Sequence, residues 1–250
     1  MCINLFIIFI KIKFYIYLNI IKIRSKKLTR RKNNAIVYLE ICLNRKFVRD
    51  VKKFLKLFLL GMLCFAISQL CLRLPILKLL NNSLLIYNFQ ILYPLLYGFI
   101  LSLSAGIFEE GCRFIFKDKF LKESKSKLDA TIFGLGHGLI EVIYVFAISF
   151  SSLNLMTNSE FFLGIYERIL AMIFHIGMTV LIWTGFARNK KYKYLILAIM
   201  MHGIFDYLIP LKYIFDFSNF MLYGIWTAIC VFILLFIVNI KLGGISNEKF

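Results

Sequence analysis

The chain alternates long apolar runs with short polar segments, and this pattern predicts membrane-spanning helices, each of about 20 residues. Six such runs are Leu57–Leu72, Ile91–Phe114, Thr131–Ser152, Phe161–Ala187, Tyr194–Leu211 and Phe220–Ile240. They are expected to be helical because a lone strand in lipid would leave its backbone groups without hydrogen-bond partners. A seventh run, Ile3–Ile21, is interrupted by Lys11 and Lys13 and fits either a span or an interfacial segment. The predicted fold class is therefore all-α, a polytopic transmembrane helical bundle with six or seven spans.

Composition agrees with this interpretation. Of the 250 residues, 60% are hydrophobic and only 18% are charged, whereas soluble domains are about 45–50% apolar and about a quarter charged. One water-soluble core cannot hide so much apolar surface, which excludes a soluble enzyme, and the same numbers exclude intrinsic disorder. The six cysteines have no metal-finger or disulfide-framework spacing and are expected to be small core residues.

The net charge of +18 lies between the apolar runs rather than in one patch, which excludes a nucleic-acid-binding protein. The segments Lys22–Lys53, Lys117–Lys127 and Arg188–Lys193 are basic, and the segments that alternate with them carry few positive charges. Positive loops stay in the cytoplasm, so we expect an integral protein of the cell membrane with a cytoplasmic C-terminus. The basic N-terminal stretch either only sets this topology or also binds anionic lipid headgroups.

The order of apolar runs and basic segments predicts three regions along the chain. Residues 1–53 form a basic N-terminal region with a possible weak first membrane segment. Residues 54–241 form a transmembrane helical domain, which is expected to be the catalytic domain. Residues 242–250 form a short cytoplasmic tail.

Ionisable residues within the predicted spans are the strongest candidates for function, because each costs at least about 2.5–3.5 kcal/mol at the bilayer centre. They are Glu109, Glu110, Arg113, His137, Glu141, His175, His202 and Asp206, and they include every histidine of the chain. With a rise of about 1.5 Å per residue, they lie roughly 9–20 Å from the nearest basic loop. Lipid-facing positions would be too costly, so we expect these side chains to meet in one polar cavity that opens toward the cytoplasm.

Several of these residues are spaced one helical turn apart, which lets an acid contact a basic side chain on the same face. The pairs are Glu109 with Arg113, Glu110 with Arg113, His137 with Glu141, and His202 with Asp206. In the two histidine pairs, the carboxylate is expected to orient the imidazole and select its tautomer. Glu167 and Arg168 lie nearer the other end of their span and are expected to form a structural ion pair.

If the cavity is hydrolytic, the known intramembrane solutions can be compared with the sequence. The HExxH zinc motif is absent, because His137 and His202 are followed by glycine and His175 by isoleucine. A GxGD signal for an aspartyl dyad is also absent, as is a serine nucleophile in a glycine-x pattern. The remaining possibility is a glutamate that acts on water with the help of histidines.

Three short motifs resemble those of a known superfamily. Glu109-Glu110-Gly-Cys-Arg113, Phe133-Gly-Leu-Gly-His137 and His202-Gly-Ile-Phe-Asp206 resemble the EExxR, FxxxH and HxxxB motifs of the CAAX-protease and bacteriocin-processing superfamily. Within it, Phe133–Glu141 and the helix of His175 resemble the YhfC-type intramembrane metalloproteases. The resemblance covers roughly Phe54 to Asn239. It departs from the usual EExxxR spacing by one residue, which leaves the exact partner of Arg113 open.

The resemblance implies a peptidase that acts on a peptide or membrane-protein substrate within the lipid bilayer. Glu109 or Glu110 would be the general base that activates water, with Arg113 holding either carboxylate. His137 and His202 would bind that water or stabilise the oxyanion, with Asp206 orienting His202. In one version His137, His175 and His202, with Glu141, hold a zinc ion. In the other version no metal is bound and the histidines act directly.

Two other classes of function remain open at this stage. Glu109, Glu141, His137 and His202 suit the proton or ion relay of a transporter, although the sequence shows no inverted repeat of the kind many transporters carry. A non-catalytic membrane interaction protein with a structural polar cluster is the third reading. The sequence sets neither the substrate nor the oligomeric state.

Overall fold

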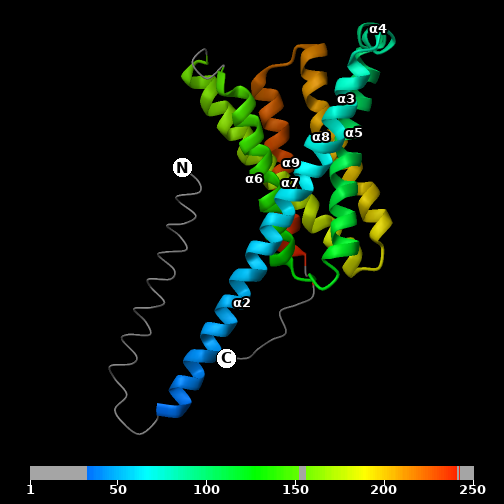
Figure 1. Ribbon diagram of the computed structural model, residues 1–250. Helices are drawn as coiled ribbons and strands as arrows, with labels where there is room; N and C mark the ends of the chain where they lie inside the picture. The colour runs from blue at the N-terminus through cyan, green and yellow to red at the C-terminus, as the bar shows by residue number, and fades with distance from the viewer. Residues whose placement is uncertain (1–32, 152–155, 241, 243–250) are drawn as a thin grey trace. The chain divides into compact units, whose positions relative to one another are not determined.

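The computed structural model describes residues 33–151, 156–240 and 242, with side chains from residue 45 onward. All regular structure within these residues is helical. The elements are α2 (Asn33–Phe65), the π-helical segment η1 (Ala66–Arg73), α3 (Leu74–Asn81), α4 (Leu84–Leu92), α5 (Pro94–Ile115), the π-helical segment η2 (Phe116–Phe120), α6 (Lys127–Ser149), α7 (Asn158–Ala187), α8 (Lys191–Phe215) and α9 (Asn219–Asn239) (Figure 1). The chain divides into two units, residues 1–52 and 53–250, and the site lies in the second.

Six helical stretches of the described residues are long and apolar enough to cross a membrane. They are Arg45–Asn81, Pro94–Phe120, Lys127–Ser149, Asn158–Ala187, Lys191–Phe215 and Asn219–Asn239. Each overlaps one of the six predicted runs, which confirms the all-α polytopic fold. The weak run Ile3–Ile21 and the tail from residue 243 onward lie outside the described residues.

Local capping residues explain why two helix boundaries differ from the apolar runs. The run that begins at Ile91 is divided, because α4 ends at Leu92 and α5 starts at Pro94. Proline favours the first position of a helix and disfavours helical geometry in the residue before it. Helix α6 begins four residues before Thr131, because the Ser126 hydroxyl accepts a hydrogen bond from the backbone N–H of Asp129 at 3.0 Å.

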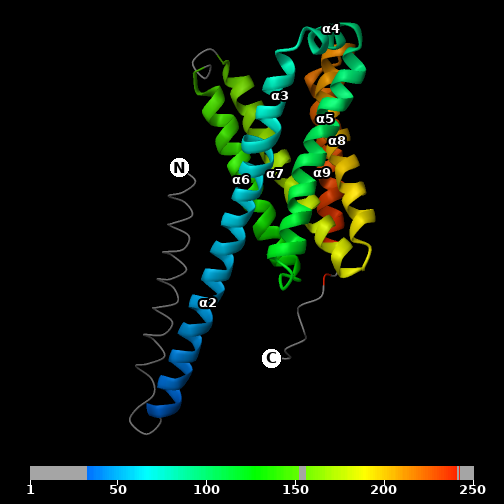
Figure 2. The same ribbon diagram turned by 45° about the vertical axis from the view of Figure 1, so that its right-hand side comes forward.

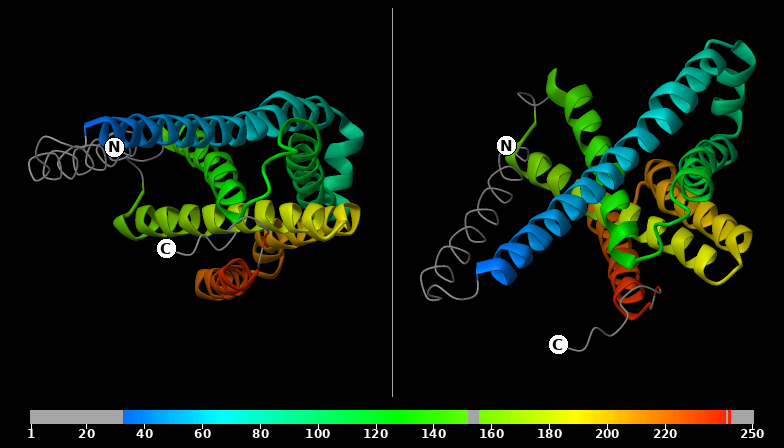
Figure 3. Two further views of the ribbon diagram at one scale, coloured as in Figure 1. Left: turned by 90° about the horizontal axis from the view of Figure 1, so that it is seen from below. Right: turned by 60° about the horizontal axis from the view of Figure 1, so that its bottom comes forward.

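Helix α7 is the central helix of the bundle. In its most apolar 18-residue window 72% of the residues are buried, against 22–33% in the other five spans. Figure 3 shows α7 with α6 on one side and α9 on the other. A capping box fixes its start, since Thr157 and Glu160 exchange side-chain and backbone hydrogen bonds. The helix that carries His175 therefore also contributes more buried residues to the core than any other helix.

Close helix contacts bring the candidate residues together. Helix α5 runs beside α8, and α6 beside α7 (Figures 1 and 2). Helix α6 also approaches α2 closely at two glycines. A Cβ added to Gly136 would lie 2.1 Å from the Phe58 carbonyl oxygen, and one added to Gly61 would lie 2.1 Å from the Phe133 carbonyl oxygen. The helix of His137 therefore sits against α2 at a distance that only glycine permits.

Replacing Gly136 with leucine is expected to destabilise the protein, because the new side chain would collide with the α2 backbone. Overpacking of this kind costs about 1–3 kcal/mol or more, which lowers the melting temperature of a chain this size by several degrees. Thermal unfolding in detergent measures the effect. Gly164→Leu in α7 is the matched control, since a Cβ there meets nothing within 4 Å. Equal melting temperatures for the two variants would contradict the close contact.

Charged contacts connect neighbouring helices on the side of the basic loops. Lys53 pairs with Asp129 at 2.7 Å, and Lys191 pairs with Asp118 at 2.8 Å. The Lys127 ammonium donates to the carbonyl oxygens of Ile237 and Val238 in the last turn of α9, at 2.9 and 3.2 Å. Toward the opposite end, α7 and α9 are connected by the hydroxyls of Tyr166 and Thr227, 2.6 Å apart.

Candidate metal centre

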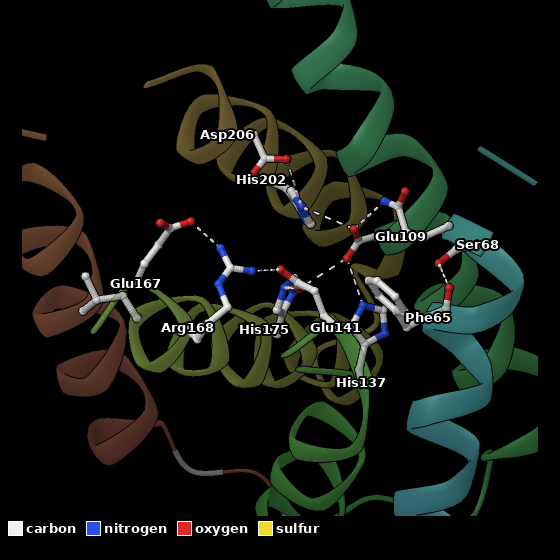
Figure 4. A network of polar contacts seen from close by, with 12 residues as sticks. Phe65, Ser68, Glu109, His137, Glu141, Glu167, Arg168, His175, His202 and Asp206 are labelled. Atoms are coloured by element: carbon white, nitrogen blue, oxygen red, sulfur yellow. Dashed lines mark hydrogen bonds and ion pairs between the residues drawn. The ribbon is translucent and has the colours of Figure 1, made fainter. Parts of the chain in front are cut away.

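Glu109 of α5 stands at the centre of the polar cluster and is only 4% exposed. Its Oε2 lies 2.9 Å from Nε2 of His137 in α6 and 3.7 Å from Nδ1 of His175 in α7. Its Oε1 lies 3.9 Å from Nε2 of His202 in α8. Figure 4 shows the side chains converging on this carboxylate from separate helices. The structure therefore brings the three histidines around one buried acid.

His202 and His175 each contact a further carboxylate through the ring nitrogen that faces away from Glu109. Nδ1 of His202 lies 2.7 Å from Oε1 of Glu110, so this N–H donates to the carboxylate and leaves Nε2 facing Glu109. Nε2 of His175 contacts Oε2 of Glu141 and leaves Nδ1 facing Glu109 (Figure 4). Histidine ligands of metals characteristically donate their other ring N–H to a carboxylate, which fixes the tautomer.

Arg113 is completely buried and contacts both acids of its own helix. Its Nη1 donates to Glu110, and its Nη2 lies 3.4 Å from Oε2 of Glu109. The spacing one residue shorter than in the resembled motif thus still reaches both predicted partners. Nη2 also donates to Nδ1 of His175 at 2.7 Å. The guanidinium therefore uses the lone pair of His175 that would bind a metal.

The expected pairing of His137 with Glu141 was wrong. Glu141 instead contacts His175 and accepts from Nη1 of Arg168 at 2.9 Å. The Nε2 of His137 contacts Glu109, and its buried Nδ1 has no partner among the described residues. The ring packs edge-on against Phe65, with 5.4 Å between centroids. Spacing along one helix did not decide the partner, because side chains from neighbouring helices come closer.

The expected pairing of His202 with Asp206 is found, with 3.6 Å between Nε2 and Oδ2. The Glu167–Arg168 ion pair is also present. Arg168 additionally contacts Glu141, so it connects the structural pair to the site. Glu167, Arg168, Glu141 and His175 thus form one continuous chain of contacts (Figure 4).

Gln69, which lies in the π-helical segment η1, is a further site residue that was not predicted from the sequence. Its side-chain amide donates to Oε1 of Glu109, and its carbonyl oxygen accepts from Nη1 of Arg73 at 3.1 Å. Gln69 is an uncharged polar residue inside the first predicted span, so the search for ionisable residues passed over it. Short π-helical turns often occur at functional sites, and this one directs a polar side chain to the central carboxylate.

The donor atoms present here fit a metal ion that takes the place of the Arg113 contact at Nδ1 of His175. Glu109, His175 and His202 each offer one atom, and these three atoms lie within 4.8 Å of one another. Two histidines and one glutamate, with a fourth position left open, are a known ligand set for catalytic zinc. Among the described residues, the buried acids Glu109 and Glu110 outnumber the one fully buried guanidinium, that of Arg113, and an added cation is one way to balance their charge. Of the ligands predicted from the sequence, this group contains His175 and His202 and has Glu109 in place of His137 and Glu141.

A cavity of about 70 Å³ adjoins this group. Its lining includes Glu109, His175, His202, Asp206 and Arg168; of the described residues, Glu110 and His137 are not part of it. Water in the cavity can therefore reach Glu109 and Asp206 directly. Arg168 lies about 15 Å from the start of α7 and about 28 Å from its end, so the cavity extends toward the end at which α7 begins.

Aromatic side chains pack together on the side of the site that leads to the basic loops. Phe133 and Trp183 are 0% and 1% exposed, and their ring centroids lie 5.4 Å apart. Phe116 packs against Phe133 with 6.0 Å between centroids. These rings come from helix segments that lead toward the Lys117 and Arg188 loops.

Comparisons with known proteins agree with the predicted resemblance to the YhfC-type proteins. The sequence model of the YhfC intramembrane metalloprotease family matches residues 35–159 and 148–233. The uncharacterized membrane protein YhfC of Bacillus subtilis is 27% identical over 200 residues, covering 64% of this chain and 74% of the relative. No solved structure gives a significant match.

Proposed function

The chain belongs to the YhfC intramembrane metalloprotease family, and from this premise we propose that it is a zinc-dependent peptidase that hydrolyses peptide bonds within the membrane. Glu109, His175 and His202 would hold the metal. One observation carries the proposal: these three ligand atoms converge within 4.8 Å, and a carboxylate holds each imidazole from behind. A purely structural ion-pair cluster does not require that arrangement.

Residues of the chain itself would accept the proton and position the ligands. A zinc ion held at this site would act as a Lewis acid on the substrate carbonyl and make a nearby water easier to deprotonate. Asp206 lines the same cavity and lies 3.6 Å from His202, so we assign to it the proton that leaves the attacking water. Glu110 positions His202, and Glu141 positions His175.

This assignment modifies the roles expected from the sequence. Glu109 becomes a ligand, and Glu110 becomes a positioning residue because it does not line the cavity. His137 supports Glu109 through its Nε2, at 2.9 Å. Arg113 offsets the repulsion between the carboxylates of Glu109 and Glu110, because it directs one nitrogen to each.

We also propose that substrate and water enter from the end at which α7 begins. The sequence predicts an opening toward the cytoplasm, but the cavity at the three ligands extends away from the basic loops, and packed aromatic rings lie on the other side. A second cavity, of about 160 Å³, is also lined by Glu167 and Arg168 and lies between α6 and α7. It supports an entrance in which Arg168 stands between the two cavities.

The proposal also includes the limits of the catalytic domain, the location of the chain, its superfamily and its substrate class. Residues 54–241 would be the catalytic domain, with the chain in the cell membrane and the C-terminus in the cytoplasm. The motif order also supports a relation to the CAAX-protease superfamily. A peptide segment of a membrane protein is the substrate class that fits a site buried among six apolar helices.

Removal and return of the metal is the direct test. Detergent-purified protein is expected to cleave members of a library of membrane-spanning peptides, as measured by mass spectrometry. A chelator should abolish cleavage, and stoichiometric zinc should restore it, because the Lewis acid is required for attack. Cleavage that survives complete metal removal would support the metal-free glutamate mechanism. Proton-coupled flux in vesicles with no cleavage of any peptide would support a transporter instead.

A further inference from the structure

A groove separate from the metal centre runs between α7, α8 and α9 near the Arg188–Lys193 loop. Its volume is about 360 Å³, within the usual range of about 300–1,000 Å³ for ligand pockets. Met178 and Leu181 of α7, Leu197 of α8, and Phe232 and Phe236 of α9 form its walls. The body of the groove is therefore apolar.

The groove opens on an exposed, apolar face of the bundle. Leu197 and Phe232 are 45% and 67% exposed, so a chain lying in the membrane could enter sideways. Lys190 and Lys193 line the end of the groove nearest the loop and are exposed. At about 1.5 Å per residue, the distance from Lys193 to Met201 along α8 is about 12 Å. The groove thus has a charged end at the membrane surface and an apolar body within the hydrocarbon.

The two lysines carry uncompensated charge. Within the part of the chain that the structure describes, neither ammonium has a hydrogen-bond or ion-pair partner, and the groove has no acidic residue in its lining. Their neighbour Lys191 differs, because it pairs with Asp118 at 2.8 Å. A lysine at this helix start can therefore form an ion pair, but Lys190 and Lys193 do not.

We propose that this groove binds an anionic phospholipid, with Lys190 and Lys193 holding the phosphate and the apolar walls holding an acyl chain. Basic pockets between helices on the cytoplasmic side are known to take anionic headgroups. A zwitterionic headgroup would bring a positive group near two ammonium groups and is disfavoured. The bound lipid would contact α7 at Met178, three residues after His175.

Native mass spectrometry of delipidated protein tests the proposal. The probes are phosphatidylglycerol and phosphatidylcholine, added separately at equal concentration. The unchanged protein is expected to retain phosphatidylglycerol preferentially, and the double variant Lys190→Gln/Lys193→Gln should bind it about tenfold or more weakly. The matched control is Lys122→Gln/Lys125→Gln, which removes two exposed lysines of another basic loop and should leave binding unchanged.

A second variant separates the apolar part from the charge. Leu197→Trp should fill the groove and reduce phosphatidylglycerol binding while both lysines remain. Equal retention of the two lipids by the unchanged protein, or an unaffected lysine double variant, would overturn the proposal. So would binding of an acidic apolar peptide without any retained phosphatidylglycerol, which would identify a peptide as the occupant. None of these measurements depends on peptidase activity.

Discussion

Replacing His175 with glutamine is expected to remove zinc from the purified protein. His175 supplies one of three converging ligand atoms, and its loss should weaken zinc binding by at least about 100-fold, more than the 10- to 100-fold typical of residues behind the ligands. Plasma mass spectrometry of the metal content, followed by competition with a chelator, measures the change. Glu141→Gln should give the intermediate effect, because Glu141 contacts the far nitrogen of His175.

His137→Gln is the control that distinguishes the two possible ligand sets. His137 is as buried as His175 and also contacts Glu109, but it is not in the group of three. The structure therefore predicts that this variant keeps its zinc, whereas the set expected from the sequence predicts that it does not. Loss of metal in His137→Gln together with retention in His175→Gln would refute the proposed centre.

Replacing Asp206 with asparagine is expected to lower the rate of peptide cleavage by about 10²- to 10⁴-fold, the usual contribution of a general base. Zinc content should stay near that of the unchanged protein, because Asp206 is not one of the three ligands. The combination matters, since a folded, metal-loaded and inactive protein places the defect in proton transfer. Turnover by detergent-purified protein, with zinc content measured on the same sample, provides both readouts.

Glu167→Gln is the matched control for Asp206→Asn. Both carboxylates line the same cavity, but Glu167 pairs with Arg168 and contacts none of the three ligands. It should therefore retain most of the activity. If Asp206→Asn is fully active while Glu110→Gln is inactive and still binds zinc, then Glu110 is the base, as the motif resemblance allows.

The fold was predictable because the bilayer imposes a simple rule on the sequence. A span needs an apolar run of a certain length, and all six strong runs became helices. Their exact ends were less predictable, because they depend on single residues such as Pro94 and the Ser126 cap. These residues act on the backbone and leave the apolar pattern unchanged.

The membership of the cluster was predictable for a related reason, since each buried charge is costly and needs a purpose. Which of these residues contact one another was less predictable. Glu141 reaches His175 on another helix instead of His137 one turn away, and a periodicity argument cannot rank contacts between helices. Gln69 is a stronger case, because it depends on a π-helical segment whose register departs from the 3.6-residue repeat.

The lysine contacts at the basic end have a consequence for motion. Lys53, Lys127 and Lys191 connect neighbouring helices there, whereas α7 and α9 are connected toward the far end by a pair of neutral hydroxyls. Thermal fluctuations that separate the helices should therefore pivot near the lysines, and their amplitude should grow with distance from that pivot. The histidines lie between these two ends. Because the ion pair of Arg168 with Glu141 also connects α7 to α6, widening to admit a peptide is expected mainly at α9, which carries none of the three ligands.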